Sequence, residues 1–192
     1  MQDIDKCREI LSHIWKIMKI KCRFYECVVL LMFRKQNYIE YVMLILSTAN
    51  IGEEEWKLKY YISDLHLFHE NAIAFDHRPF ASLQEMHDTI LKNWNDRVTN
   101  GDMVYILGDV SMRGKKEELI AFVAQLKGRK VLIKGNHDDV SDYRYQQLFH
   151  EICDYKEMHD TIGKEHYSLV LSHYPIFSWR NMGRGRILLY GH

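Results

Sequence analysis

The hydrophobic positions in the first part of the chain repeat with the spacing of a helix. From Ile4 to Met18 they recur at steps of three and four, which predicts an amphipathic helix. Two further apolar blocks follow, at residues 27–33 and 41–46. We expect residues 1–57 to form a helical N-terminal extension of unknown role. A pair of helices packed on the main domain, an interaction arm, or sequence upstream of a later start methionine would each fit this pattern.

After this segment, strand and helix patterns alternate. Every second residue from 58 to 62 is apolar, as in a strand with one buried face. Ser82, with Glu85 three residues later, forms the capping box that begins a helix. A second helix is predicted at 115–127, closed by Gly128. The other patterned segments are predicted strands, at 103–107, 130–134, 167–171 and 186–190. This order predicts an α/β fold, with mixed β-sheets in a sandwich flanked by helices, over residues 58–192.

Composition narrows the class of protein further. The chain has 192 residues, which is the size of one domain with an appendage, and 47% of them are hydrophobic, enough for a packed core. Its formal net charge is zero. A protein that holds nucleic acid through its phosphates has a basic excess, so the neutral charge disfavours a general nucleic-acid partner. It leaves open a site whose positive charge comes from bound metal.

Cysteines and apolar runs give no sign of secretion or of a membrane. The four cysteines form no Cys-x-x-Cys pair, which favours reduced thiols in a cytoplasmic protein. The N-terminus is acidic where a signal peptide is basic, and charged and polar residues interrupt the most apolar stretch, so we expect no transmembrane helix. A zinc site is the alternative use of the N-terminal thiols, with the ligands Cys7, His13, Cys22 and Cys27.

Polar residues with metal-binding side chains follow each predicted strand of the main domain. The segments are Ser63-Asp64-Leu65-His66, Gly108-Asp109, Gly135-Asn136-His137-Asp138, Ser172-His173 and Gly191-His192. Ligands bind beyond the carboxyl ends of strands in sheets of this kind, so the pattern predicts one cluster of these side chains.

The donor types in this cluster indicate a pair of metal ions. Carboxylate, imidazole and amide donors without thiolate suit manganese, iron(II), cobalt or zinc. They are too many for one ion and sufficient for two. Two divalent cations carry four positive charges, of which Asp64 and Asp109 offset two, so the site would attract a phosphate anion.

The motifs in this order resemble the calcineurin-like metallophosphoesterase superfamily. The phrases SDLHLFHENAI, HRPF, YILGDV, KGNHDD, LSHYPIFSW and RGRILLYGH are similar to a small bacterial and phage branch of phosphoesterases, from about Lys59 to the last residue. The resemblance implies metal-dependent hydrolysis of a small phosphate monoester or diester. It also implies two divalent metal ions, with manganese expected first and iron, zinc, cobalt or nickel as alternatives.

The resemblance implies a role for each motif residue. Asp64 and His66 would bind the first metal, Asp109 would bridge both metals, and Asn136, His173 and His192 would bind the second. His137 would face the substrate and assist the leaving oxygen, and Asp138 would orient the His137 ring. The resulting hypothesis is attack on phosphorus by a hydroxide held between the two metals.

The sequence departs from the family's terminal motif, Gly-His-x-His. It ends at His192, so the second histidine of the motif, which would complete the ligands of the first metal, is absent. We therefore expect either a fragment of a longer product or an under-coordinated first metal that binds poorly. Two other functions stay open: a non-catalytic scaffold of the same fold, which the intact ligand motifs disfavour, and a nuclease or cyclic-nucleotide phosphodiesterase.

Residues near the motifs have two interpretations. His69, Asn71 and Arg78 would either border the substrate pocket or pack the turn around Pro79. Arg180, Arg184 and Arg186 would either form a rim for an anionic substrate or be ordinary solvated arginines. The aromatic residues near the motifs, Trp94, Trp179 and Tyr174, are predicted to belong to the core or the pocket wall.

Overall fold

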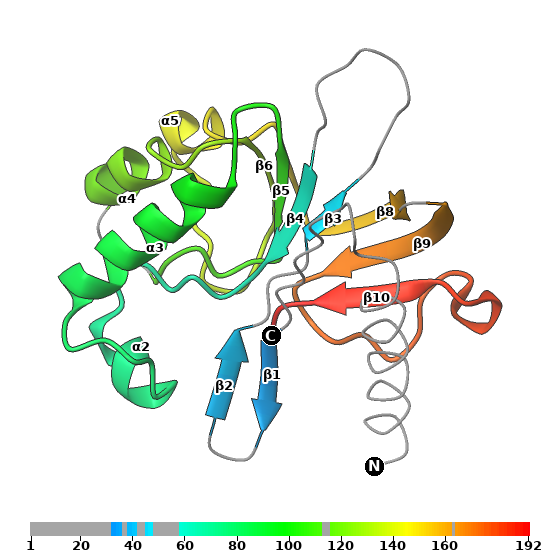
Figure 1. Cartoon of the computed structure of the whole chain (residues 1–192), viewed down its shortest axis with the longest axis horizontal. Helices are drawn as coiled ribbons and strands as arrows, with labels where there is room; N and C mark the ends of the chain where they lie inside the picture. The colour runs from blue at the N-terminus through cyan, green and yellow to red at the C-terminus, as the bar shows by residue number, and fades with distance from the viewer. Residues whose placement is uncertain (1–31, 36–37, 42–44, 48–57, 113–115, 163) are drawn as a thin grey trace.

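Strands and helices alternate in the main domain up to residue 153, and strands then follow one another (Figure 1). The structure is a computed structural model that describes residues 32–35, 38–41, 45–47, 58–112, 116–162 and 164–192. Its strands are β1 (Met32–Lys35), β2 (Tyr38–Tyr41), β3 (Ile45–Ser47), β4 (Leu58–Ile62), β5 (Met103–Ile106), β6 (Arg129–Ile133), β7 (Glu151–Cys153), β8 (Tyr155–Ile162), β9 (Glu165–Ser172) and β10 (Ile187–Tyr190). Its helices are α2 (Glu70–Phe75), α3 (Leu83–Arg97), α4 (Lys116–Val123), α5 (Tyr143–Gln146) and the short 3-10 helix η1 (Met182–Arg184).

The central sheet brings three strand ends to one level. Its order is β3-β4-β5-β6-β7, with β4 to β7 parallel and β3 antiparallel at the edge. Ile62 pairs with Ile106, and Ile106 pairs with Leu132. The loops after β4, β5 and β6 therefore leave the sheet side by side, where ligands gather in α/β sheets.

A second sheet, in the order β10-β9-β8, packs against the other face of the central sheet (Figure 1). β8 and β9 are antiparallel, whereas β9 and β10 are parallel, with Ser172 paired to Tyr190. The residues that follow β9 and β10 therefore also leave their sheet side by side.

Alternating residues of the central strands supply two separate cores. Tyr60, Ile106 and Leu132 face the helices, where they pack with residues of α3 and α4 such as Trp94 and Phe122. The residues in between face the second sheet and pack with Leu169 and Leu171 of β9; they are Tyr61, Tyr105, Val131 and Ile133. Strands covered on both faces are expected to be apolar throughout, which explains the continuous hydrophobic runs of β5 and β6. The α/β sandwich predicted from the sequence is confirmed.

The capping box identified in the sequence begins α3. The Ser82 side chain accepts a hydrogen bond from the Glu85 backbone N–H, and Glu85 in turn accepts one from the Ala81 backbone N–H. The chain after α4 turns at Gly128, which has a φ of +85°. Among the described residues, no helix is long and apolar enough to cross a bilayer.

The N-terminal segment differs from expectation where the structure describes it. Residues 32–47 contain β1, β2 and β3 rather than the helices that we expected. β-branched and aromatic residues such as Phe33, Tyr38 and Ile39 favour strands, and this preference prevails over the weak helical pattern. β3 pairs with β4, so the central sheet extends across the predicted boundary at residue 57. The helix predicted from Ile4 to Met18 and the alternative zinc site lie outside the described residues.

Candidate metal centre

Three glycines let the strand ends approach each other closely. Gly108 has a φ of +93°, and a Cβ there would overlap the His173 ring and lie 2.8 Å from the backbone of Gly135. A Cβ on Gly135 would overlap the Asp109 carboxylate, and one on Gly191 would lie 2.7 Å from Cβ of Ser63. Glycine is therefore needed at these three positions because neighbouring backbones and ligand side chains occupy the space of a side chain.

The first group of candidate ligands consists of Asp64, His66 and Asp109, whose donor atoms all lie within 4.8 Å of one another. Nε2 of His66 is 3.7 Å from Oδ1 of Asp64 and 3.6 Å from Oδ2 of Asp109. Backbone hydrogen bonds join the two loops, because the His66 N–H donates to the Asp109 carbonyl at 3.0 Å. Two of the predicted ligands thus come from one loop and the third from the next strand.

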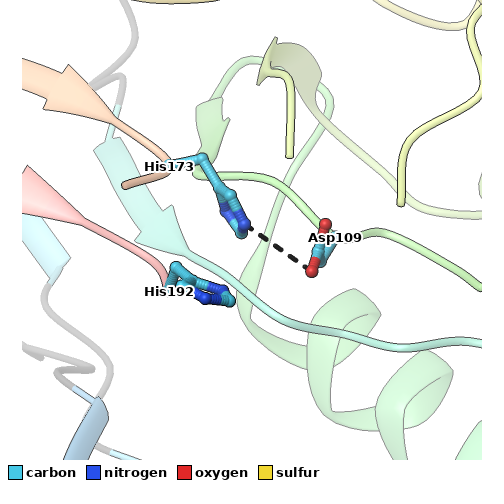
Figure 2. Close-up of side chains that lie close together, drawn as sticks. All are labelled: Asp109, His173 and His192. Carbon is cyan, nitrogen blue, oxygen red and sulfur yellow. Dashed lines mark ion pairs between the residues drawn. The ribbon is translucent and has the colours of Figure 1, made fainter. Parts of the chain in front are cut away.

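The second group consists of Asp109, His173 and His192, also within 4.8 Å of one another. Figure 2 shows the two imidazoles reaching from the ends of β9 and β10 toward the Asp109 carboxylate. Nε2 of His173 lies 3.6 Å from Oδ2 of Asp109. The His192 backbone N–H donates to the His173 carbonyl at 2.8 Å, which fixes the two residues next to each other. Asp109 is therefore common to both groups.

Asn136 joins the second group through His173. Nδ1 of His173 lies 2.8 Å from the Leu107 carbonyl and donates to it, so Nε2 is the ring nitrogen that faces Asn136 and Asp109. That nitrogen lies 3.0 Å from the Asn136 side-chain oxygen. A histidine that donates its other N–H to a backbone carbonyl is typical of metal ligands.

The loop residues of the first group have a strained backbone. Asp64, His66 and Asp109 have φ values of 51°, 49° and 53°, in the left-handed region that residues with a Cβ seldom occupy. Strain of this kind concentrates at functional sites, where the surrounding structure imposes it.

Burial also changes the protonation of the first group. Burial, and next the neighbouring Asp109 carboxylate, raise the pKa of Asp64 from 3.8 to about 8. Burial, and next the positive charge of Arg78, lower the pKa of His66 to about 4. Without a cation, Asp64 therefore keeps its proton beside the Asp109 carboxylate until the pH rises toward 8. His66 is neutral at physiological pH and able to bind a metal.

A divalent metal fits these residues. Oδ1 of Asp64 is buried and has no hydrogen-bond partner among the described residues. Oδ2 of Asp109 is 3.6 Å from Nε2 of both His66 and His173, which is too long for hydrogen bonds. Two donors that each bind one metal at about 2.1 Å are about 3.0–3.4 Å apart, close to these separations.

Asp138 has a different role from the one we expected. Its carboxylate accepts hydrogen bonds from the backbone N–H groups of Asp109, Val110 and Gly135 at 2.8–2.9 Å. It therefore joins the loops after β5 and β6, instead of orienting the His137 ring. Burial raises the pKa of Asp138, while these three hydrogen bonds oppose that rise.

His137 and His69 both lie beside the first group. The His137 ring is 6.1 Å from the His66 ring, and its backbone N–H donates to Oδ1 of Asp109 at 3.0 Å. The centroids of the His69 and His66 rings are 5.9 Å apart. Nδ1 of His69 is buried and has no hydrogen-bond partner among the described residues. Asn71 is exposed on α2.

The arginines of the sequence analysis have structural partners. Arg78 is buried, and its guanidinium donates to the backbone carbonyls of Asp64 and Leu65. Arg180 and Arg186 both pair with Glu157 of β8, and Arg184 is exposed at the end of η1. A rim of arginines at the metal centre is therefore not formed by these ion-paired residues.

The predicted aromatic residues divide between core and site. Trp94 is buried in the helix-facing core, and the Trp179 indole N–H donates to the Arg186 carbonyl. Tyr174 is half-exposed, and its ring contacts the rings of His173 and His192, with centroids 4.9 and 5.2 Å apart. Tyr174 therefore forms part of the wall of the second group.

One supporting residue was missed in the sequence. His87 of α3 is buried, and its Nε2 accepts a hydrogen bond from the Phe68 backbone N–H at 3.0 Å. A single histidine on a helix gives no sign of such a contact, because it depends on how α3 packs against the loop after β4.

Comparison with known proteins decides the family. The family model for calcineurin-like phosphoesterases matches residues 60–192. The chain belongs to the calcineurin-like phosphoesterase family. The resemblance recognised from the motifs is therefore confirmed, and the match covers every candidate ligand of the two groups, the second sheet, and the central sheet except β3 and the start of β4.

The chain is similar to proteins of an archaeon and of phages. An uncharacterised protein of Methanocaldococcus jannaschii, MJ1445, is 42% identical over 80 residues, which are 41% of this chain and 46% of that protein. The Gene 66 protein of Mycobacterium phage D29 is 30% identical over 155 residues, 69% of this chain and 76% of the phage protein. A crystal structure of AQ665 from Aquifex aeolicus, of unknown function, has a TM-score of 0.49 and 33% identity, covering 61% of this chain and 60% of that one. The match thus spans less than half of the archaeal relative.

Proposed function

We propose that this phosphoesterase hydrolyses a small phosphate ester, monoester or diester, with two divalent metal ions that share the Asp109 carboxylate. The observation that carries this proposal is the position of Asp109 Oδ2, 3.6 Å from an imidazole nitrogen of each ligand group. Membership of the calcineurin-like phosphoesterase family supports the same reaction class.

The two groups give each ion a different set of ligands. The first ion would be held by Asp64, His66 and Asp109, and the second by Asp109, Asn136, His173 and His192. Oxygen and nitrogen donors without thiolate favour manganese, with iron, zinc, cobalt or nickel as alternatives. When bound, two such metal ions would polarise the phosphoryl oxygens and supply a nucleophile from water at neutral pH.

The chain's own residues would orient the substrate and provide a proton. Two carboxylates, Asp64 and Asp109, offset only part of the charge of two divalent ions, so the site would attract a phosphate group. His137 is half-buried beside His66 and is not in either ligand group, which leaves its ring available to the substrate. We assign His137 the transfer of a proton to the leaving oxygen. Asp138 supports it indirectly by holding the loop that carries it.

The test is hydrolysis of bis-p-nitrophenyl phosphate by the full chain, with Mn²⁺ and with EDTA. We expect activity that requires metal. With an alkyl ester such as glycerol phosphate, whose leaving oxygen needs a proton, we expect the activity to fall about 100-fold in His137→Ala, because general acid catalysis contributes at least that factor. The matched control is His150→Ala, an exposed histidine whose backbone N–H donates to Lys130 at the opposite end of the central sheet. Activity in EDTA, or equal activity of the His137 and His150 variants toward the alkyl ester, would contradict the proposal.

A further inference from the structure

The loop after β4 has a backbone path that it cannot hold without outside contacts. Asp64, His66 and Phe68 have φ values of 51°, 49° and 61°, so every second residue of the loop is left-handed. On one side the N–H groups of Asp64, His66 and Leu67 donate to the carbonyls of Gly108, Asp109 and Val110 at 2.9–3.1 Å. These bonds use the N–H groups of the loop. The backbone carbonyls of Asp64 and Leu65 still need hydrogen-bond donors.

The Arg78 guanidinium supplies those donors. Its Nη1 donates to the Leu65 carbonyl at 2.8 Å and its Nη2 donates to the Asp64 carbonyl at 2.9 Å. The Arg78 side chain is only 2% exposed, so these bonds are made away from competing water. One planar fork thus holds the backbone of a candidate metal ligand and of the residue between the two ligands of that loop.

The direction of the fork is itself fixed. Nε and Nη2 of Arg78 donate to Oδ2 of Asp76 at 3.2 and 3.0 Å. The Arg78 backbone N–H donates to the Ile73 carbonyl at 2.9 Å. A rigid fork oriented by a carboxylate holds a backbone more precisely than a lysine ammonium, which is a point charge on a flexible stem.

We propose that Arg78 is a positioning residue that sets the Asp64–His66 loop for the first metal ion and has little effect on the second. This inference rests on the proposed function. The second group is held by other contacts, from His173 to the Leu107 carbonyl and from the His192 N–H to the His173 carbonyl. Loss of Arg78 therefore acts on the two ions unequally.

Removal of Arg78 should change the affinity for the first metal ion in opposite directions, depending on whether Arg78 positions the loop or acts only through its charge. A guanidinium repels a nearby metal cation, so its charge alone would make removal of Arg78 strengthen metal binding. If Arg78 instead holds the loop, its removal weakens binding, because Asp64 and His66 no longer share one geometry.

The experiment is a Mn²⁺ titration of the full chain by calorimetry, for the wild type, Arg78→Gln and Arg78→Lys. Asp64→Asn and His173→Ala identify which binding step belongs to which group. In Arg78→Gln we expect the step that Asp64→Asn removes to weaken about 10–100-fold, as for other residues that support metal ligands. The step that His173→Ala removes should stay within about twofold, and Arg78→Lys should recover only part of the loss.

Asp102→Asn is the control for a general loss of stability. Asp102 is a buried carboxylate that accepts from the backbone N–H groups of Leu58 and Thr99 at 2.8 and 2.7 Å, at the opposite end of β4. It should lower the urea midpoint and leave both metal steps unchanged. If Arg78→Gln does not fold, Asp76→Asn replaces it, because it frees the fork while keeping the arginine.

Three results would overturn the inference. Equal weakening of both steps would make Arg78 a general structural residue, and unchanged or tighter binding of the first ion would leave only its charge. A wild type that binds no Mn²⁺ would overturn the proposed function as well, whereas normal wild-type binding with an unaffected Arg78 variant would overturn the role of Arg78 alone.

Discussion

The two ligand groups are built in different ways, although they share Asp109. Asp64 and His66 of the first group are two residues apart in one loop, and hydrogen bonds from neighbouring backbone hold that loop. The second group draws His173 and His192 from the ends of two strands in the other sheet. The first group therefore depends on the conformation of one loop, and the second depends on how the two sheets are docked.

The docking of the sheets rests on an apolar layer to which polar links are added. Tyr61 and Tyr105 stack with ring centroids 5.1 Å apart, next to Leu169 and Leu171 of β9. The Tyr61 hydroxyl donates to the buried Asp160 carboxylate of β8 at 2.5 Å. The two imidazoles of the second group differ in exposure, since His173 is 1% exposed whereas His192 is exposed. Perturbing the loop and perturbing the docking should therefore affect different ions.

Asp109→Asn should have the largest effect, because it removes the carboxylate that both groups use. We expect both Mn²⁺ binding steps to be lost and kcat/KM for bis-p-nitrophenyl phosphate to fall by at least about 100-fold. Equilibrium dialysis and the hydrolysis assay measure the two effects. If one binding step survives unchanged, Asp109 is not common to both groups.

Gly135→Ala should come next, because the new methyl group would overlap the Asp109 carboxylate. We expect a loss of about 1–3 kcal/mol in the free energy of unfolding and weaker binding in both steps. Urea denaturation and the Mn²⁺ titration are the measurements. Gly183→Ala is the matched control, since a Cβ there has no neighbour within 4 Å. Similar behaviour of the two variants would show that the approach of the two loops is not tight.

His173→Ala and His192→Ala should separate the buried ligand from the exposed one. His173→Ala should weaken the second ion about 100-fold and His192→Ala about tenfold, because removing His173 also leaves the Leu107 carbonyl without its donor. Neither should change the first ion by more than about twofold. Competition with a fluorescent chelator can resolve these differences, and equal losses would mean that burial does not decide the contribution.

The effect predicted to be smallest in the metal-loaded protein is a pH dependence of stability, which is expected only without metal. The folded pKa of Asp64, about 8, lies above its value of 3.8 in the unfolded chain, so the folded state binds this proton more tightly. The stability from protonated Asp64 is fully present below pH 4 and is lost as pH rises toward 8. In EDTA, the urea midpoint of the wild type should therefore fall between pH 5 and 8.5.

Asp64→Asn is the comparison for this measurement, because the amide mimics the protonated acid and does not titrate. The unfolding free energy of this variant should change less over the same range than that of the wild type, by about 4 kcal/mol, which is about 1.4 kcal/mol for each pH unit between 5 and 8. Added Mn²⁺ should reverse the loss in the wild type, since the ion replaces the proton. Parallel pH profiles of the two proteins would place the titration elsewhere.

The sequence predicted which side chains lie together better than it predicted the contacts that hold them there. Strand patterns followed by Asp, Asn and His indicated one cluster, and the parallel register explains why those ends meet. The contacts of Asp138 and Arg78 were not predictable, because each joins segments whose approach is set by tertiary packing. β8 was missed because its sequence, YKEMHDTI, lacks a two-residue apolar period.

The left-handed backbone of Asp64, His66 and Asp109 brings two selective demands into conflict. Thermal stability favours glycine at these positions, whereas metal binding requires the side chains that are there. Each such residue costs about 1–3 kcal/mol relative to a relaxed backbone. Glycine would relieve that cost at all three positions, and would remove a metal ligand each time. Selection of variants for heat resistance alone should therefore accumulate glycine at these positions, and only a simultaneous demand for turnover would keep the ligands in place.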